Sequence, residues 1–121
     1  MATLFTHLLL QYNNMTLRQD KIEQVIKGHA ATFLENESNK TALLTVTNCT
    51  ISSDMKKATI YFTVLPESKE KAALDFAKRK RTEMRTYIKK HMETKIIPFI
   101  EIEIDQGEKH RQKIDELLRQ G

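Results

Sequence analysis

Residues 42–65 read ALLTVTNCTISSDMKKATIYFTVL, and this stretch decides the fold. Its two ends, 42–51 and 58–65, are rich in valine, isoleucine, threonine and aromatic residues, which favour β-strands. The polar cluster at 52–57 between them is typical of a turn. The stretch therefore predicts two adjacent antiparallel strands.

A helix is expected before this hairpin. Apolar side chains from Leu17 to Leu34 recur at spacings of three and four residues, which is typical of one face of an amphipathic helix. The pattern predicts a helix over roughly residues 18–35, followed by a polar loop.

The start of this helix suggests a domain boundary. Thr16 and Gln19 stand at the spacing of a capping box, a signal for the first turn of a helix. We therefore expect an N-terminal appendage at residues 1–14, a domain at 15–105 and a helical tail at 106–121. The appendage lacks the basic start of a signal peptide and is too short to span a bilayer, so no membrane partner is expected.

A second, longer helix is expected after the hairpin. Residues 69–91 contain neither glycine nor proline, and apolar side chains recur toward both ends of the stretch. Between them, residues 78–83 contribute no apolar side chain. Either the helix bends at this interruption, or the aliphatic parts of Lys80 and Arg81 lie across the core while their charged ends reach solvent.

A third strand is expected near the C-terminal end. Isoleucines alternate with acidic residues at 100–105, as in a strand with one buried and one solvated face. Pro98 cannot donate a hydrogen bond to a neighbouring strand, which places it at the start of the strand or at a sheet edge. Gly107 is then expected to break the chain, and a short amphipathic helix is predicted by Ile114, Leu117 and Leu118.

The order of elements is helix, strand, strand, long helix, strand and short helix, which predicts an α+β fold. A chain of 121 residues is long enough for one domain. We expect one core, formed by the apolar stripes of both main helices and by the inward side chains Val46, Ile60, Phe62, Ile100 and Ile102.

Positive charge is concentrated in the second helix. The chain has 20 Lys and Arg residues against 16 Asp and Glu, a net charge of +4. Residues 69–95 hold ten basic and four acidic residues, whereas residues 96–121 hold four basic and six acidic ones. This concentration favours a polyanionic partner such as nucleic acid. The alternative is a solvated helix face without a ligand.

Four of these cations share one side of the predicted helix. Residues 78, 81, 85 and 89 are spaced so that they can follow a phosphate backbone together. Tyr87 can stack on a base, although its spacing from apolar neighbours favours core packing. The candidate RNA-binding residues are Lys78, Arg79, Lys80, Arg81, Arg85, Lys89 and Lys90.

Nothing in the sequence indicates catalysis. Glu101, Glu103 and Asp105 are expected on the solvated face of the third strand, because alternation alone requires polar residues there. The four histidines lack a mutual spacing typical of a metal site, so we expect no metal, no cofactor and no enzymatic activity. Cys49 cannot form an internal disulfide, is expected to be buried, and fits a reducing compartment such as the cytoplasm.

Several residues of the hairpin stand at the spacings found in the bacterial ribosome-binding factor A family, which this sequence resembles. They are Thr45-Val46-Thr47, Ser52, Asp54-Met55, Ala58 and Ile60-Tyr61-Phe62-Thr63. The resemblance covers roughly residues 17–118 and continues through Arg85, Lys95-Ile96-Ile97-Pro98, Asp105 and Ile114-Asp115-Glu116-Leu117-Leu118. It implies a type II KH-like domain, with two helices on one face of a three-stranded sheet.

The resemblance also implies a function. Members of this family are non-enzymatic assembly factors that bind the immature small ribosomal subunit, contact its rRNA, and leave when maturation is complete. We expect this chain to act in this way as a monomer, late in maturation. The alternative is a small basic α+β module that docks an acidic protein partner.

One position departs from the family pattern. The family has an Ala-x-Gly triplet at a kink between two helices, and this triplet falls on Lys80-Arg81-Thr82 when counted back from Pro98. Glycine there provides backbone freedom and close approach, which these residues do not offer. The break in the apolar stripe nevertheless falls on the same three residues.

Overall fold

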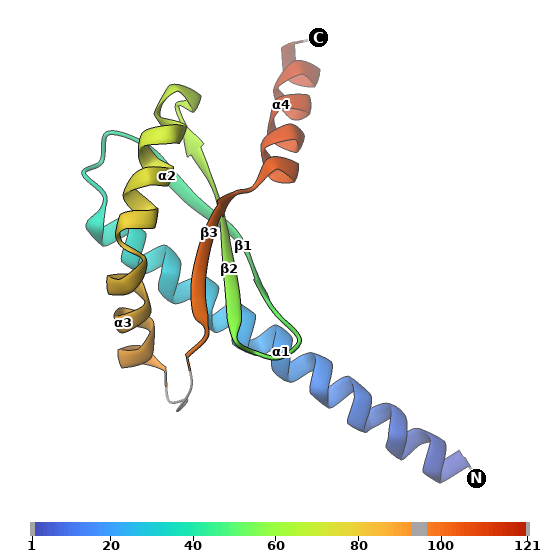
Figure 1. Cartoon of the computed structure of the whole chain (residues 1–121). Coiled ribbons are helices and arrows are strands. Elements are labelled where there is room, and N and C mark those ends of the chain that lie inside the picture. Colours follow the sequence, from blue (N-terminus) through green and yellow to red (C-terminus); the bar gives the residue numbers. More distant parts are fainter. Residues whose placement is uncertain (1, 93–96, 121) are drawn as a thin grey trace.

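The computed structural model describes residues 2–92 and 97–120, with side chains described from Arg18 onward. Its elements are α1 (Ala2–Glu37), β1 (Leu43–Ile51), β2 (Lys57–Leu65), a short 3₁₀ turn (Glu67–Lys69), α2 (Glu70–Arg79), α3 (Arg81–His91), β3 (Phe99–Ile104) and α4 (Gln106–Gln120) (Figure 1). The predicted α+β class and the predicted order of strands are confirmed.

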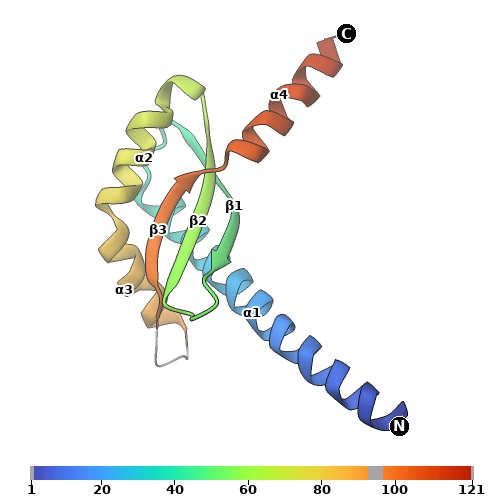
Figure 2. The same ribbon diagram turned by 45° about the vertical axis from the view of Figure 1, so that its right-hand side comes forward.

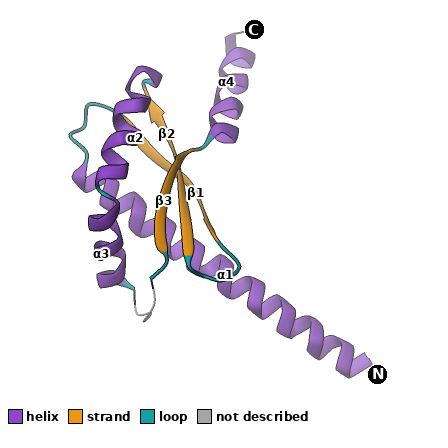
Figure 3. Ribbon diagram, in the orientation of Figure 1, coloured by secondary structure: helices purple, strands orange, loops and turns teal. Residues whose placement is uncertain are grey.

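The three strands form one mixed sheet in the order β1-β2-β3. β1 pairs with β2 in antiparallel register, and β2 pairs with β3 in parallel register (Figure 3). Ile60 lies at the centre, opposite Cys49 on one side and Ile102 on the other. β3 is therefore an edge strand, and the α2–α3 connection carries the chain across the sheet to reach it.

Helices α1, α2 and α3 cover one face of this sheet, as a type II KH-like domain requires. Four of the five strand residues expected in the core are buried: Ile60 and Phe62 at 0% exposed, Ile102 at 1% and Ile100 at 2%. Val46 is only partly buried. The helices contribute Ile26, Ala30, Phe33, Leu34, Ala73, Ala77, Met84 and Ile88. The predicted stripes of both main helices thus meet the sheet in one core.

α1 is longer than predicted. It begins at Ala2, so the expected helix start at the capping box of Thr16 and Gln19 is wrong. No glycine or proline precedes Gly28 to end the helical path. The Gln19 side chain instead donates a hydrogen bond of 3.1 Å to the carbonyl of Ile51 in β1. The proposed boundary of the appendage at residue 14 stays a prediction.

The C-terminal helix begins at Gln106, at the start of the expected tail, but the break expected at Gly107 is wrong. Gly107 does not break the chain but lies in the first turn of α4, because Asp105 caps that turn by accepting a hydrogen bond of 3.0 Å from the Glu108 backbone N–H. Ile114, Leu117 and Leu118 lie on α4 as predicted, with 57%, 60% and 73% of their surfaces exposed. α4 leaves one end of the sheet while the N-terminal half of α1 projects past the other end (Figures 1 and 2).

Candidate nucleic-acid interface

The predicted long helix is broken at Lys80. Its φ and ψ angles are −93° and 5°, and its backbone N–H donates to the carbonyls of Phe76 (3.1 Å) and Ala77 (3.2 Å), which closes α2 before α3 begins. Of the two alternatives left by the sequence, the bend is therefore confirmed. A negative φ of this size is accessible to any L residue, so the break requires no glycine.

Side chains on either side of the break hold it in place. The ammonium group of Lys80 lies 3.7 Å from a Glu37 carboxylate oxygen at the end of α1 and 3.3 Å from Glu83 in α3. Arg81 donates from Nε to the carbonyl of Lys78, at 3.2 Å. The break is thus tied to α1 on one side and closed by a side-chain cap on α2.

Arg81 also reaches the edge of the sheet. Its Nη1 lies 3.3 Å from Oε2 of Glu101 in β3, and both side chains are about one third exposed, at 38% and 31%. Glu101 lies off the core, as the alternation predicted, but it has a specific partner. This ion pair joins α3 to β3 and takes up part of the positive charge expected to face RNA.

Arg85 is held by backbone carbonyls. Its Nη2 donates to Ile97 at 2.9 Å, and its Nε donates to Pro98 at 3.3 Å. These contacts fix the chain just before β3 against α3. Charge spacing alone cannot reveal them, because the acceptors are main-chain groups that only the folded topology brings to Arg85.

The other four candidate cations are exposed. Lys78 and Arg79 end α2, and Lys89 and Lys90 lie in the last turn of α3. Within the described ranges none of them forms an ion pair. Residues 78, 81, 85 and 89, which were expected to share one helix face, are divided by the break. Lys78 lies on α2, and the other three lie on α3.

A groove of about 400 Å³ runs between α3 and β3, lined by Arg81, Thr82, Arg85, Thr86, Phe99 and Ile100. Phe99 is 56% exposed, which is unusual for a large apolar side chain beside two guanidinium groups. Sequence reasoning did not select Phe99. Phe99, Glu101 and Glu103 are alternate residues of one strand, so the sequence could have predicted that Phe99 also lies on the solvated face.

The ring of Tyr87 is not available to stack on an RNA base. It stacks on His91 with ring centroids 4.1 Å apart and packs against Phe33 at 5.6 Å. The expected packing role of Tyr87 is confirmed. His29 completes this aromatic cluster, 5.6 Å from the ring of His91.

The remaining residues considered from the sequence have ordinary surroundings. Cys49 is buried as expected, and burial raises the pKa of its thiol to about 12. Among the described side chains, those of residues 18–92 and 97–120, His, Cys, Asp and Glu form no group of three or more that could hold a metal ion. Over residues 2–92 and 97–120, no helix is long and apolar enough to cross a membrane.

Comparison with known proteins agrees with this fold. The family model described as Ribosome-binding factor A matches residues 18–118. Ribosome-binding factor A of Magnetococcus marinus is 27% identical over 108 residues, covering 86% of this chain and 88% of that relative. Lys95 and Ile96, which belong to the resemblance described above, lie outside the described residues.

Solved structures of ribosome-binding factor A have a similar fold. The crystal structure of ribosome-binding factor A from Thermus thermophilus matches with a TM-score of 0.64 and 20% identity, covering 71% of this chain and 94% of that one. A homology model of the Thermus protein, fitted into the cryo-EM map of a 30S–RbfA complex, matches with a TM-score of 0.58 and 20% identity, covering 65% and 86%. The family match spans most of the chain, and the chain therefore belongs to the ribosome-binding factor A family.

Proposed function

We propose that this protein binds the immature small ribosomal subunit and its rRNA during late maturation, in the cytoplasm, and acts by binding without catalysis. Membership of the family supports a ribosomal target. The Thermus relative fitted into a 30S complex supports the small subunit as that target. Release after maturation follows from the role of an assembly factor.

The observation that carries the RNA assignment is the arrangement around the α3–β3 groove. Exposed cations lie on both sides of the break, and the exposed aromatic ring of Phe99 lines the groove. Cations that follow a phosphate backbone release counterions, while an aromatic ring offers a stacking surface to an unpaired base. The groove therefore suits a single-stranded segment of rRNA.

The seven candidate residues divide into two roles. Lys78, Arg79, Lys89 and Lys90 are the proposed phosphate contacts, because they are exposed and, unlike the equally exposed Arg85, have no side-chain hydrogen bond or ion pair among the described residues. Lys80, Arg81 and Arg85 keep their positive charge near the RNA, but their hydrogen bonds and ion pairs hold the groove together. Four phosphate contacts predict a log–log slope of affinity against salt of about −3, at roughly −0.7 per contact.

The test compares two doubly substituted proteins. Lys78→Gln/Lys89→Gln removes two proposed contacts, whereas Lys21→Gln/Lys113→Gln removes two exposed charges elsewhere. The first pair should flatten the salt slope for single-stranded RNA by about 1.4 and weaken co-sedimentation with free small subunits. The second pair should change neither.

Three results would oppose the proposal. Equal effects of both pairs would indicate non-specific charge attraction. A loss of binding explained by a lower melting temperature would indicate unfolding. Association that survives ribonuclease treatment of the subunits would favour an acidic protein partner instead of RNA.

A further inference from the structure

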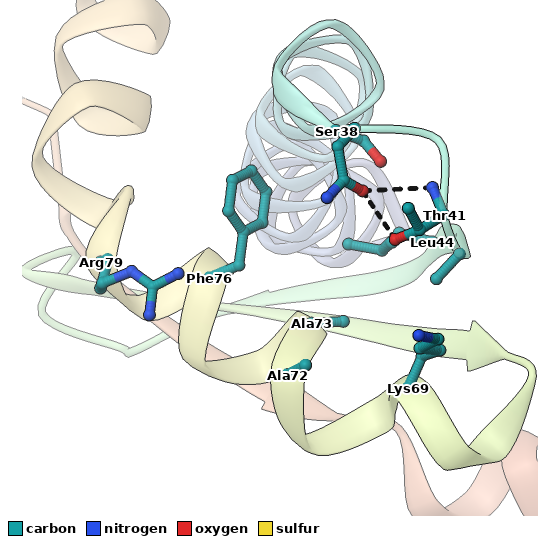
Figure 4. Close-up of a pocket in the computed structure, with 10 residues that line it drawn as sticks. Ser38, Thr41, Leu44, Lys69, Ala72, Ala73, Phe76 and Arg79 are labelled. Atoms are coloured by element: carbon teal, nitrogen blue, oxygen red, sulfur yellow. Dashed lines mark hydrogen bonds between the residues drawn. The ribbon is translucent and has the colours of Figure 1, made fainter.

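A second hollow lies beside α2 and shares no lining residue with the α3–β3 groove. It has a volume of about 220 Å³ and opens between α2 and the loop that joins α1 to β1 (Figure 4). The loop and the start of β1 contribute Ser38, Asn39, Thr41, Ala42 and Leu44, and the opposite wall contributes Lys69, Ala72, Ala73, Phe76 and Arg79. We call this hollow the α2 pocket.

Local structure explains why the α2 pocket is open. α1 ends at Glu37, and the chain returns to the sheet through residues 38–42. The facing turn of α2 presents Ala72 and Ala73, whose side chains are too small to fill the space. The volume is below the roughly 300–1,000 Å³ of sites for drug-sized ligands, so it suits one compact group.

The polar groups of the α2 pocket are mostly donors. Oδ1 of Asn39 already accepts hydrogen bonds from the backbone N–H (3.1 Å) and the hydroxyl (2.7 Å) of Thr41, which leaves the Asn39 amide nitrogen to donate. Lys69 and Arg79 add positive charge, and no acidic side chain lines the pocket. A ligand that matches this lining offers acceptors and negative charge.

The apolar part of the lining is aromatic. Phe76 is half-buried and lies beside Arg79, with Ala72 and Leu44 completing the apolar surface (Figure 4). Unpaired RNA bases are typically held by stacking on aromatic rings or guanidinium planes while their edges form hydrogen bonds. A nucleobase with its phosphates combines a flat apolar body, acceptor atoms and negative charge.

The α2 pocket adjoins the exposed cations at the α2–α3 break. Arg79 lines the pocket and belongs to the exposed cations at the α2–α3 break. The ion pair of Lys80 with Glu37 places the end of α1, beside the pocket wall, next to this break. A strand that leaves the α3–β3 groove across the break therefore passes Arg79 on its way to the pocket.

We propose that the α2 pocket receives one unstacked base of the bound RNA strand. The base lies against Phe76 and accepts from Asn39, while Arg79 and Lys69 contact phosphates on either side of it. This inference rests on the proposed RNA function. It adds a base-binding site outside the α3–β3 groove, so the strand is held at two separate places.

The experiment follows backbone amide signals of the full-length, isotope-labelled protein by NMR. One probe is an eight-nucleotide oligouridylate, and the other is a phosphoribose chain of the same length without bases. Both should shift signals of Thr82 and Thr86 in the groove, because both carry phosphates. The oligouridylate should shift signals of Asn39, Thr41 and Phe76 much more than the base-free chain, because phosphates alone reach only Lys69 and Arg79 at the rim of the base site.

Two variants test the pocket directly. Ala72→Leu fills it from an exposed helical position, and Phe76→Leu keeps apolar volume but removes the ring. Each should weaken oligouridylate binding by about tenfold, in line with stacking of one base, and leave binding of the base-free chain unchanged. Thr32→Leu, an exposed position on α1 outside the pocket, is the matched control and should change neither affinity.

The outcomes separate this inference from the proposed function. If groove signals shift and pocket signals do not, the base site is wrong and the RNA function stands. If neither set of signals responds to oligouridylate, the RNA function itself fails. If pocket signals respond to an acidic amphipathic peptide of Glu and Leu but not to oligouridylate, the pocket is a protein site and the proposal is overturned.

Discussion

The guanidinium group of Arg85 donates a hydrogen bond of 2.9 Å to the backbone carbonyl of Ile97. Ile97 is 4% exposed, so this carbonyl has little access to water. Arg85 therefore supplies a partner to a buried acceptor and fixes the chain where it enters β3. Arg85 also lines the α3–β3 groove.

Arg85→Gln should lower the free energy of unfolding by about 1–3 kcal/mol, the usual cost of leaving a buried acceptor without its partner. Arg81→Gln should cost less than about 1 kcal/mol, because its ion pair with Glu101 is partly exposed and screened by solvent. Urea unfolding of both variants provides the measurement. Equal stabilities would show that the carbonyl of Ile97 finds another partner.

Phe62→Ala should destabilise the domain by about 3–5 kcal/mol, because Phe62 is 0% exposed and its removal leaves a cavity beneath the helices. Thr45→Ala in the neighbouring strand is the control, since Thr45 is exposed. Denaturant melts with tryptophan-independent detection, such as circular dichroism, suit this chain, which has no tryptophan. A loss below about 1 kcal/mol would contradict the assigned core.

Asp105→Ala should cost about 1–2 kcal/mol through loss of the N-cap of α4. It also removes the hydrogen bond of 2.5 Å that the Thr47 hydroxyl donates to Oδ2 of Asp105. Asp105→Asn keeps one oxygen acceptor and should cost less. Thermal melting gives the stability, and amide exchange in the first turn of α4 shows whether that turn frays. Unchanged exchange in Asp105→Ala would mean that the helix start has another cap.

Cys49 predicts an alkaline loss of stability. Burial raises the pKa of its thiol from 9.0 to about 12, with Glu23 adding a smaller contribution. Because the unfolded thiol ionises first, the stabilisation is complete below pH 9.0 and is lost as the pH rises toward about 12. Wild type should therefore lose more stability between pH 8 and pH 11 than Cys49→Ala. Parallel losses in the two proteins would place the titrating group elsewhere.

Removal of residues 1–14 should leave the melting temperature nearly unchanged. Among the described side chains, the tertiary hydrogen bonds of α1 to the sheet come from Gln19 and Glu23, which the truncated protein keeps. Differential scanning calorimetry of the truncated and full-length chains is the measurement. A drop of several degrees would show that the start of the domain lies before residue 15.

The elements that the sequence predicts well are those set by local patterns. Alternation at 100–105 identifies β3, because side chains of a strand point to opposite faces whatever surrounds them. The start of α4 was also within reach, since Asp105 and Glu108 stand at capping-box spacing. At Thr16 a capping-box pattern predicted a helix start that the structure does not have. A residue that could cap a helix does not start a new one when the residues before it are also helical.

The candidate site is less accessible from sequence. The gap in the apolar stripe located the break to within a few residues, but the choice between a bend and a straight helix depended on contacts of Lys80 with α1. The division of cations into exposed ones and those engaged by Glu101 or by main-chain carbonyls also needs the folded topology. A charge count treats Lys78 and Arg85 alike. In the described part of the chain, however, Arg85 donates to a main-chain carbonyl, whereas the side chain of Lys78 has no such partner.

The residues at the Lys80 break determine the distance over which this part of the protein attracts a nucleic acid. A glycine at this turn would let a nucleic-acid backbone approach the main chain closely, and such a contact acts only at short distance. Lysine and arginine act over roughly the Debye length, about 8 Å at physiological ionic strength, and their attraction fades as salt rises. We therefore expect ionic strength to govern how firmly this protein holds its site more than it would for a relative whose turn carries glycine.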